Sequence, residues 1–318
     1  MKSLNKSSII KSRSYGGNKG LIKAMRKQWQ LYALLSVPIL FALVFKYGSM
    51  VGLVTAFKDY KVVKGFWDSE WVGLENFIKI FKMKNFGIAL RNTLLLNVLT
   101  LLFGFPMPII LALLLNEVKN VHYKKVTQTL LYLPHFLSYV IIGAIAYQLF
   151  GVNSGVVNNF IEMMGGERIP FLQEDYHWLV TYVVINVWQS MGWGTIIYLA
   201  AIAGVNPELY EAAKIDGANR FQRVLYITLP CIKSTAITLL IMNLGKLMNG
   251  SFDSVYALRN VATTKFTTTI PVLIYQFGIA GGKFSESTAI GLFQSVVGLA
   301  LVLGSDFVAK KMGEEGLI

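Results

Sequence analysis

Charged side chains are scarce in this sequence. Only 15% of its 318 residues are Asp, Glu, Lys or Arg, whereas 54% are hydrophobic. Soluble domains carry about 25% charged residues. The composition therefore argues against a soluble domain and indicates a membrane protein.

Cysteine is rarer still, because Cys231 is the only one. A single cysteine excludes an internal disulfide and any metal site built from several cysteines. Its position beside Pro230, where a charged stretch enters an apolar run, is typical of a small packing residue. We expect Cys231 to be buried by packing and the chain to hold neither a metal nor a cofactor.

Two means of supplying energy are also missing. The sequence has no G-x-x-x-x-G-K-[ST] phosphate loop, since the Gly-Gly-Lys at 281–283 is followed by Phe284. The apolar runs hold no Asp or Glu away from their ends, although proton relays in membranes need such groups. If the chain serves an ATP-driven process, nucleotide hydrolysis would therefore belong to a partner. Two other classes of protein are an ion- or proton-coupled secondary carrier and a membrane anchor or sensor protein.

Positive charge is what the sequence does contain. The net charge is +13, and eight Lys or Arg residues precede Gln28 with no acidic residue among them. A nucleic-acid-binding protein would need a basic patch on a folded surface. Basic segments beside apolar runs instead mark the cytoplasmic side of a membrane. We predict a basic cytoplasmic tail over residues 1–28 and no nucleic-acid partner.

Six stretches are long and apolar enough to cross a bilayer as helices. They cover residues 31–56, 92–115, 126–150, 177–204, 232–249 and 287–308. The predicted fold is therefore all-α, a polytopic membrane protein with six transmembrane helices. After the tail we expect a first helix with an outer segment (29–90), a core transmembrane domain (91–309) with a charged loop at 205–230, and a cytoplasmic tail (310–318).

The charges of the loops predict the orientation. The loop at 117–125 is net basic, and Lys310 and Lys311 follow the last apolar run. The loop at 151–176 carries four acidic residues against one arginine, as expected of an outer loop. Both termini and the loop at 205–230 are thus predicted to be cytoplasmic, in a multi-pass protein of the cell membrane.

The charged loop reads as two short helices. Asn206 can cap the first helix and Pro207 suits its first turn, where no amide donor is needed. Gly217 can supply the left-handed conformation in which helices often end. A second helix is predicted over 218–229 and leads into the fifth span past Pro230. Taken alone, this pattern is that of an ordinary amphipathic loop between spans.

A spacing pattern in this loop carries more information. Glu211-Ala212-Ala213 is followed after three residues by Gly217, after nine more by Ile227, and then by Leu229-Pro230. This is the complete EAA motif, EAA-x3-G-x9-I-x-LP. The chain resembles the membrane subunits of binding-protein-dependent ABC importers, which have the type I importer fold of the maltose transporter.

Other segments resemble the carbohydrate-type permeases of this family. They are WVGLENFIKIF at 71–81, FKYGSMVGLVTAFKDYK at 45–61 and GLFQSVVGLALVL at 291–303, and the last two are similar to the LplB-like branch. That branch imports oligosaccharides and polysaccharides. The chain departs from many members at its end, where Ile318 replaces an aromatic residue.

The resemblance implies a mechanism and partners. The first helix of the loop would be a coupling helix that docks in a cleft of a cytoplasmic ATPase, and ATPase closure would drive alternating access. The ATPase dimer would bind ATP and Mg, this chain would catalyse nothing, and a second homologous permease and an extracellular solute-binding protein would complete the importer. The coupling residues would be Leu209, Glu211, Ala212, Ala213, Asp216, Gly217 and Pro230.

The substrate path is predicted from the fourth and fifth spans. Trp178, Tyr182, Asn186, Gln189 and Trp193 fall on one helical face, where amides and aromatic rings suit a sugar. Asn243, Lys246 and Asn249 lie similarly on the fifth span. The amides could equally join helices to each other. Likewise, Lys246 could meet an acidic sugar or form a hydrogen bond between helices.

Overall fold

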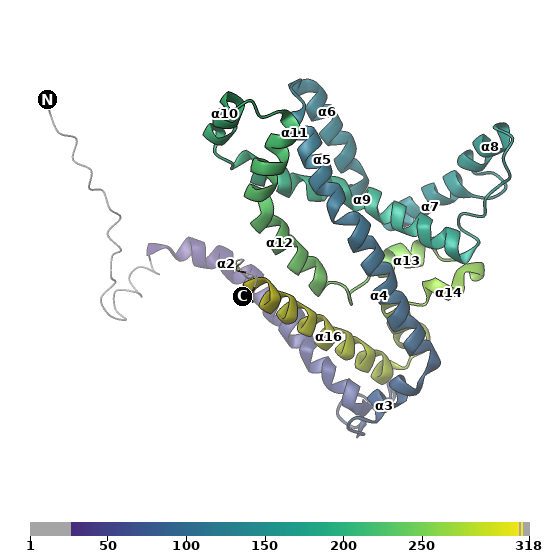
Figure 1. Cartoon of the computed structure of the whole chain (residues 1–318). Coiled ribbons are helices and arrows are strands. Elements are labelled where there is room, and N and C mark those ends of the chain that lie inside the picture. Colours follow the sequence, from purple (N-terminus) through teal and green to yellow (C-terminus); the bar gives the residue numbers. More distant parts are fainter. Residues whose placement is uncertain (1–26, 312, 314–318) are drawn as a thin grey trace. The chain divides into compact units, whose positions relative to one another are not determined.

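The computed structural model describes residues 27–311 and 313. Most of the predicted basic tail and of the predicted tail at 310–318 therefore lies outside the described residues. The described part is almost entirely helical (Figure 1). It also has one antiparallel pair of two-residue strands. The chain divides into two units, Met1–Val54 and Thr55–Ile318.

The described part of the first unit is one long apolar helix. Helix α2 (Trp29–Ala42) continues through a π turn (Leu43–Tyr47) and a 3-10 helix (Gly48–Phe57). α2 buries none of its residues. A helix that is apolar on all sides without being buried suits lipid. Trp29–Phe57 is long and apolar enough to cross a membrane, in agreement with the predicted first span.

The second unit begins with a small strand pair and a long apolar helix. Strands β1 (Lys58–Asp59) and β2 (Glu70–Trp71) precede helices α3 (Glu75–Lys82), α4 (Lys84–Gly104) and α5 (Pro106–Glu117). Pro106 begins α5, where its missing amide is tolerated. Lys84–Glu117 together is long and apolar enough to cross a membrane, so the predicted second span is found.

The predicted third span is not one continuous helix, and that prediction was wrong. Helix α6 (Val121–Tyr132) ends in a 3-10 turn (Leu133–Phe136), and α7 (Tyr139–Phe150) leaves at a bend of 105°. Pro134 lies in the 3-10 turn, and a proline disturbs the preceding turn of a helix. Ser138 then caps α7 by accepting the Ile141 amide.

Two polar side chains order the loop that follows α7 and contains α8 (Val156–Met163). Asn158 is fully buried and its amide donates to the carbonyls of Gly151 and Ile169, at 3.0 and 2.9 Å. The Arg168 guanidinium donates to the carbonyls of Val152 and Asn153, at 2.7 and 2.9 Å. The two ends of the loop are thereby fastened to each other.

Helix α9 (Asp175–Ala203), with 29 residues, is the central helix of the second unit. It contacts α4, α5 and the later helix α12 (Leu229–Gly245). Gly192 allows α9 to approach α6 closely, because a Cβ atom at this position would overlap the carbonyl oxygen of Leu131. Trp178, on the same helix, is fully buried and donates its indole hydrogen to the Leu258 carbonyl at 2.8 Å.

The remaining elements complete the second unit. They are α10 (Pro207–Ile215), α11 (Arg220–Arg223), a π turn (Val224–Thr228), α12, α13 (Phe252–Leu258), a 3-10 turn (Val261–Thr263), α14 (Thr264–Thr267), α15 (Ile270–Tyr275), a π turn (Gln276–Ala280) and α16 (Phe284–Lys311). α12 and α16 pack against each other, and α16 ends with an ion pair between Asp306 and Lys310 at 3.0 Å.

Four helices in the described residues are long and apolar enough to span a membrane, or five if the bent pair counts as one span. They are Trp29–Phe57, Lys84–Glu117, Arg220–Gly245 and Phe284–Lys311, with Val121–Phe136 and Tyr139–Phe150 as the bent pair. α9 is long but is not among them. The chain is thus a multi-pass helical membrane protein, and the predicted number of six spans is not confirmed.

Candidate functional site

Helix α10 is held by a cap at each end. The Asn206 side chain accepts the Glu208 amide at 3.1 Å, and Pro207 occupies the first turn. At the other end Ala218 donates to the Ala213 carbonyl at 2.8 Å and Gly217 to that of Lys214 at 3.2 Å. This pair of bonds is a Schellman motif, which needs a left-handed residue. Gly217 has φ +79°, so the prediction that it ends the helix in the left-handed conformation is confirmed.

The outer face of α10 is open. Leu209, Glu211, Ala212 and Asp216 are exposed, and Ala213 is half-buried. The predicted coupling residues therefore share one short, rigid helix and the turn that ends it. Pro230 lies apart from them, in the first turn of α12.

The second half of the loop differs from the prediction. Its helix begins at Arg220 and not at residue 218, because Asn219 and Gln222 form a capping box with bonds of 2.9 and 2.8 Å. The helix then widens into the π turn Val224–Thr228, in which Leu229 donates to the Val224 carbonyl. Pro230 follows directly, and a proline cannot donate the amide bond that an α-helix would need there.

Cys231 is exposed, so its predicted burial by packing is wrong for the chain alone. It lies one residue after Pro230 in the first turn of α12.

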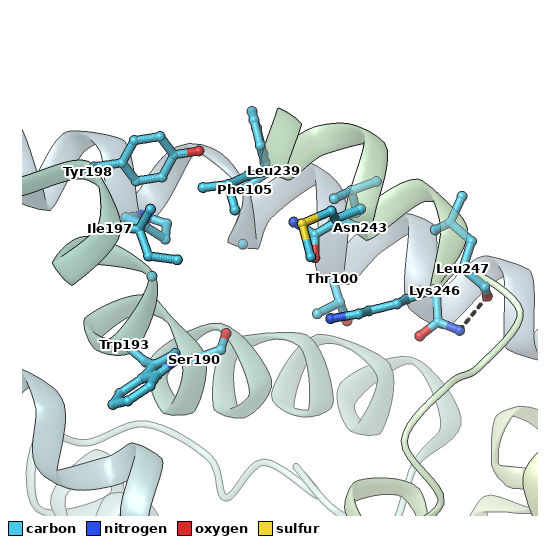
Figure 2. Close-up of a pocket in the computed structure, with 16 residues that line it drawn as sticks. Thr100, Phe105, Ser190, Trp193, Ile197, Tyr198, Leu239, Asn243, Lys246 and Leu247 are labelled. Carbon is cyan, nitrogen blue, oxygen red and sulfur yellow. Dashed lines mark hydrogen bonds between the residues drawn. The ribbon is translucent and has the colours of Figure 1, made fainter. Parts of the chain in front are cut away.

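A pocket lies between α4, α5, α9 and α12. Its volume is about 410 Å³, within the usual range for small-molecule sites. Figure 2 shows Lys246 extending from α12 into this space, with Asn243 beside it and Trp193 and Ser190 on α9. Trp193, Asn243 and Lys246 were predicted for the substrate path, and the structure brings them together.

Several polar residues of the pocket were not predicted from the sequence. Asn97, Thr100 and Tyr198 all belong to the lining. The hydroxyls of Thr100 and Tyr198 are buried and have no hydrogen-bond partner in the described part of the chain. Buried polar groups are usually satisfied, so these two hydroxyls are exceptions beside the pocket. In the sequence these three are isolated polar residues on apolar helices. Nothing in their spacing distinguished a pocket residue from one that packs between helices.

Tyr182, Asn186 and Gln189 do not line this pocket. The Tyr139 hydroxyl lies 3.0 Å from the Asn186 side-chain oxygen and 3.3 Å from that of Gln189. The Gln189 amide also reaches the carbonyl of His135, at 3.4 Å. Tyr182, Asn186 and Gln189 are all buried. The side-chain amides of Asn186 and Gln189 therefore join α9 to the broken third span.

The other predicted path residues take different places. Tyr182 bonds to the Ser254 hydroxyl at 3.0 Å. Asn249 accepts from the Gln294 amide at 3.2 Å and is not part of the pocket lining. A place on the substrate path stays a prediction for Tyr182, Asn186, Gln189 and Asn249.

The break in the third span also reaches the pocket. His135 stacks on Trp193, with ring centroids 4.7 Å apart and planes at 10°. Trp193 is 45% exposed and belongs to the pocket lining. The turn that bends the third span therefore contacts a residue of the pocket.

Apolar helices surround a pocket that contains several polar side chains, and the capped helix α10 is exposed. Residues 90–312 match the family described as binding-protein-dependent transport system inner membrane component. Since the match covers well over half of the chain, the chain belongs to this family. The resemblance drawn from the EAA motif is confirmed.

Two relatives from Bacillus subtilis (strain 168) match over nearly their whole length. Protein LplB is 46% identical over 295 residues, which are 92% of this chain and 92% of LplB. The polygalacturonan/rhamnogalacturonan transport system permease protein YteP is 44% identical over 297 residues, 93% of this chain and 92% of YteP.

A solved structure agrees with these relatives. A chain of the bacterial alginate ABC transporter, crystallised in complex with an alginate pentasaccharide-bound periplasmic protein, superposes with a TM-score of 0.84 and 38% identity. The match covers 93% of this chain and 99% of that chain. The protein is thus a permease subunit of a binding-protein-dependent importer.

Proposed function

We propose that this chain forms half of the pathway of an ATP-driven importer for oligosaccharides that bear carboxylate groups. One observation carries the proposal. The helix that follows the EAA loop, α12, presents Asn243 to the pocket, and Lys246 follows at its C-cap. The chain from α10 to the place where a substrate would lie is therefore short.

The proposed partners follow from the exposed face of α10. An ATPase chain would receive α10 in a cleft, with Glu211 paired to an arginine and the small side chains of Ala212 and Ala213 allowing close approach. ATP and Mg would be bound by an ATPase dimer, and this chain would catalyse no reaction. A second homologous permease and an extracellular solute-binding protein would complete the importer.

The proposed topology has six crossings, with both termini and α10 in the cytoplasm. The bent third span and α9 would supply the two crossings beyond the four clear ones. The support is the basic loop at 117–125 and the acidic loop at 151–176. ATPase closure would then move α10 and swing the spans so that the pocket opens to the outside in alternation with the cytoplasm.

The proposed substrate class rests on the charge of the pocket. Lys246 is the one charged residue among the described lining residues, and no acidic residue accompanies it. The rest of the lining offers an indole ring, hydroxyls and amides, which suit a sugar ring. A related transporter structure is described as importing the acidic polysaccharide alginate. A carboxylate near Lys246 would form a charge-assisted hydrogen bond.

Co-purification of the ATPase with this permease tests the proposal. Gly217→Pro should abolish co-purification of the ATPase, because proline cannot adopt the left-handed turn that ends α10 or donate its amide hydrogen bond. Gly282→Pro is the matched control, since Gly282 also has a positive φ and donates its amide, to Gly278. The control should retain the ATPase.

Retention of the ATPase by the Gly217→Pro protein would contradict docking at α10. Solute uptake by the purified chain alone, driven by a proton gradient, would contradict the ATP-driven importer altogether.

A further inference from the structure

One side-chain hydrogen bond ties α10 to the helix that follows it. Unlike the exposed residues around it, Tyr210 is half-buried on the inner side of α10. Its hydroxyl lies 2.9 Å from the hydroxyl of Thr228, at the end of the π turn that leads into α12. Thr228 is only 2% exposed. The bond therefore connects the open helix to a buried point at the base of α12.

The Thr228 hydroxyl has a second partner. It also lies 3.4 Å from the Arg223 carbonyl, which can only accept. A hydroxyl has one hydrogen to donate and two lone pairs to accept. When Thr228 donates to Arg223, its oxygen accepts from Tyr210. The resulting chain of bonds runs from α10 through Thr228 to the last residue of α11.

The backbone connection between α10 and α11 is a poor transmitter by comparison. It consists of the short turn at 216–219, in which Gly217 has a positive φ and an added Cβ would meet nothing within 4 Å. Small turns of this kind absorb motion as hinges. The exposed ion pair between Arg220 and Glu117, at 3.8 Å, fastens α11 to α5 and not to α10.

We propose that the Tyr210–Thr228 hydrogen bond is the tie that transmits displacement of α10 to α12, which makes Tyr210 a positioning residue for transport. By contrast, the side chain of Glu208 accepts from Asn206 at the start of the same helix, at 3.2 Å. Without the Tyr210–Thr228 bond, α10 pivots at Gly217 and the fifth span follows less completely. The inference rests on the proposed docking of an ATPase at α10.

Movement of α12 can be measured without knowledge of the substrate. Cys231 is the single cysteine of the chain and is exposed at the start of α12. A thiol-reactive fluorophore on Cys231, in the assembled importer with cysteine-free partner subunits, reports the change on addition of ATP and Mg. Tyr210→Phe should reduce this ATP-dependent change by about two- to tenfold, the effect of one net hydrogen bond. ATPase binding and hydrolysis should persist.

The matched control is Tyr226→Phe. This change also removes a tyrosine hydroxyl. Tyr226 lies in the π turn that contains Thr228, but its side chain is 72% exposed. The Tyr226→Phe protein should give the full ATP-dependent signal. An equal loss in both variants would overturn the proposal.

A change at Thr228 removes the same hydrogen bond from its other end. Thr228→Val deletes the acceptor from a buried position away from the exposed face of α10, so it tests the tie even if Tyr210→Phe disturbs docking. The double variant should be no worse than either single one, because both remove one bond. Thr228→Ser should retain the signal. A full signal in the Thr228→Val importer would overturn the inference.

The two hypotheses fail differently. If the unmodified permease brings down no ATPase, the proposed docking is wrong. If the ATPase binds and hydrolyses ATP in every variant while the Cys231 signal never changes between them, only the role of Tyr210 is wrong.

Discussion

Single residues decide how closely the helices of this permease approach each other. Gly192 is the sharpest case, because its backbone meets the carbonyl of Leu131 with no room for a methyl group. Small residues at helix contacts in membranes permit such close approach. The sequence contains 28 glycines, and nothing in their spacing distinguishes Gly192 from those in open space.

Gly192→Ala should destabilise the protein by about 2 kcal/mol or more, since overpacking in a tight contact commonly costs 1–3 kcal/mol. The measurement is the midpoint of thermal unfolding in detergent. The matched change is Gly87→Ala in α4, where an added Cβ meets nothing within 4 Å. Gly87→Ala should leave the midpoint unchanged or raise it slightly, because alanine favours helix. Similar midpoints for both variants would refute the close contact.

At Gly217 the constraint is conformation and not space. Its φ of +79° is a region that residues with a Cβ rarely adopt. Gly217→Ala should therefore destabilise the end of α10 by about 1 kcal/mol, while Gly217→Asn should be tolerated better, since asparagine visits this region more readily. Amide hydrogen exchange of Ala218, whose amide closes the turn, measures the effect. Equal protection in both variants would contradict it.

At the scale of elements, the bend between α6 and α7 explains why two amides lie buried on α9. The bend frees the carbonyl of His135, which accepts from Gln189, and it brings the Tyr139 hydroxyl to Asn186 and Gln189. A sequence pattern shows that polar residues share a helical face but not what the face meets. The amide face of α9 was predictable, and its partners were not.

Replacing Asn186 and Gln189 together with leucine should lower the thermal midpoint, because the Tyr139 hydroxyl loses both acceptors. An unsatisfied buried polar group costs about 1–3 kcal/mol. Adding Tyr139→Phe should recover part of the loss, since removing both partners is nearly neutral. If instead the double variant keeps its midpoint but loses uptake, these amides belong to the substrate path.

At the scale of the whole molecule, the family and the short helix α10 were predictable from the sequence, because the EAA motif fixes seven positions over 20 residues. The caps at Asn206 and Gly217 were predictable for the same reason, since they are local. The pocket was not, because Asn97, Thr100 and Tyr198 come from α4 and α9 and meet only through packing. The length of the apolar stretches also did not predict the number of crossings, since α9 is long but polar on one face.

The charge of the pocket gives a prediction for the assembled importer. Lys246→Gln should reduce uptake of an oligosaccharide of uronic acids by about tenfold or more, since hydrogen bonds to charged groups contribute about 1.5–3 kcal/mol. Lys246→Arg should retain most of the uptake. The assay is accumulation of a labelled oligogalacturonide in cells that express all subunits. Unchanged uptake by the Lys246→Gln importer would show that Lys246 makes no contact with the substrate.

The loop closed by Asn158 and Arg168 has a consequence for assembly. Its backbone is already fastened at both ends before any other protein arrives, so a partner that touches it does not have to order it. Ordering a loop on association opposes binding, and a loop shaped in advance avoids that loss of conformational entropy. The two side chains thus lower the entropy cost of any contact that this loop makes with another protein.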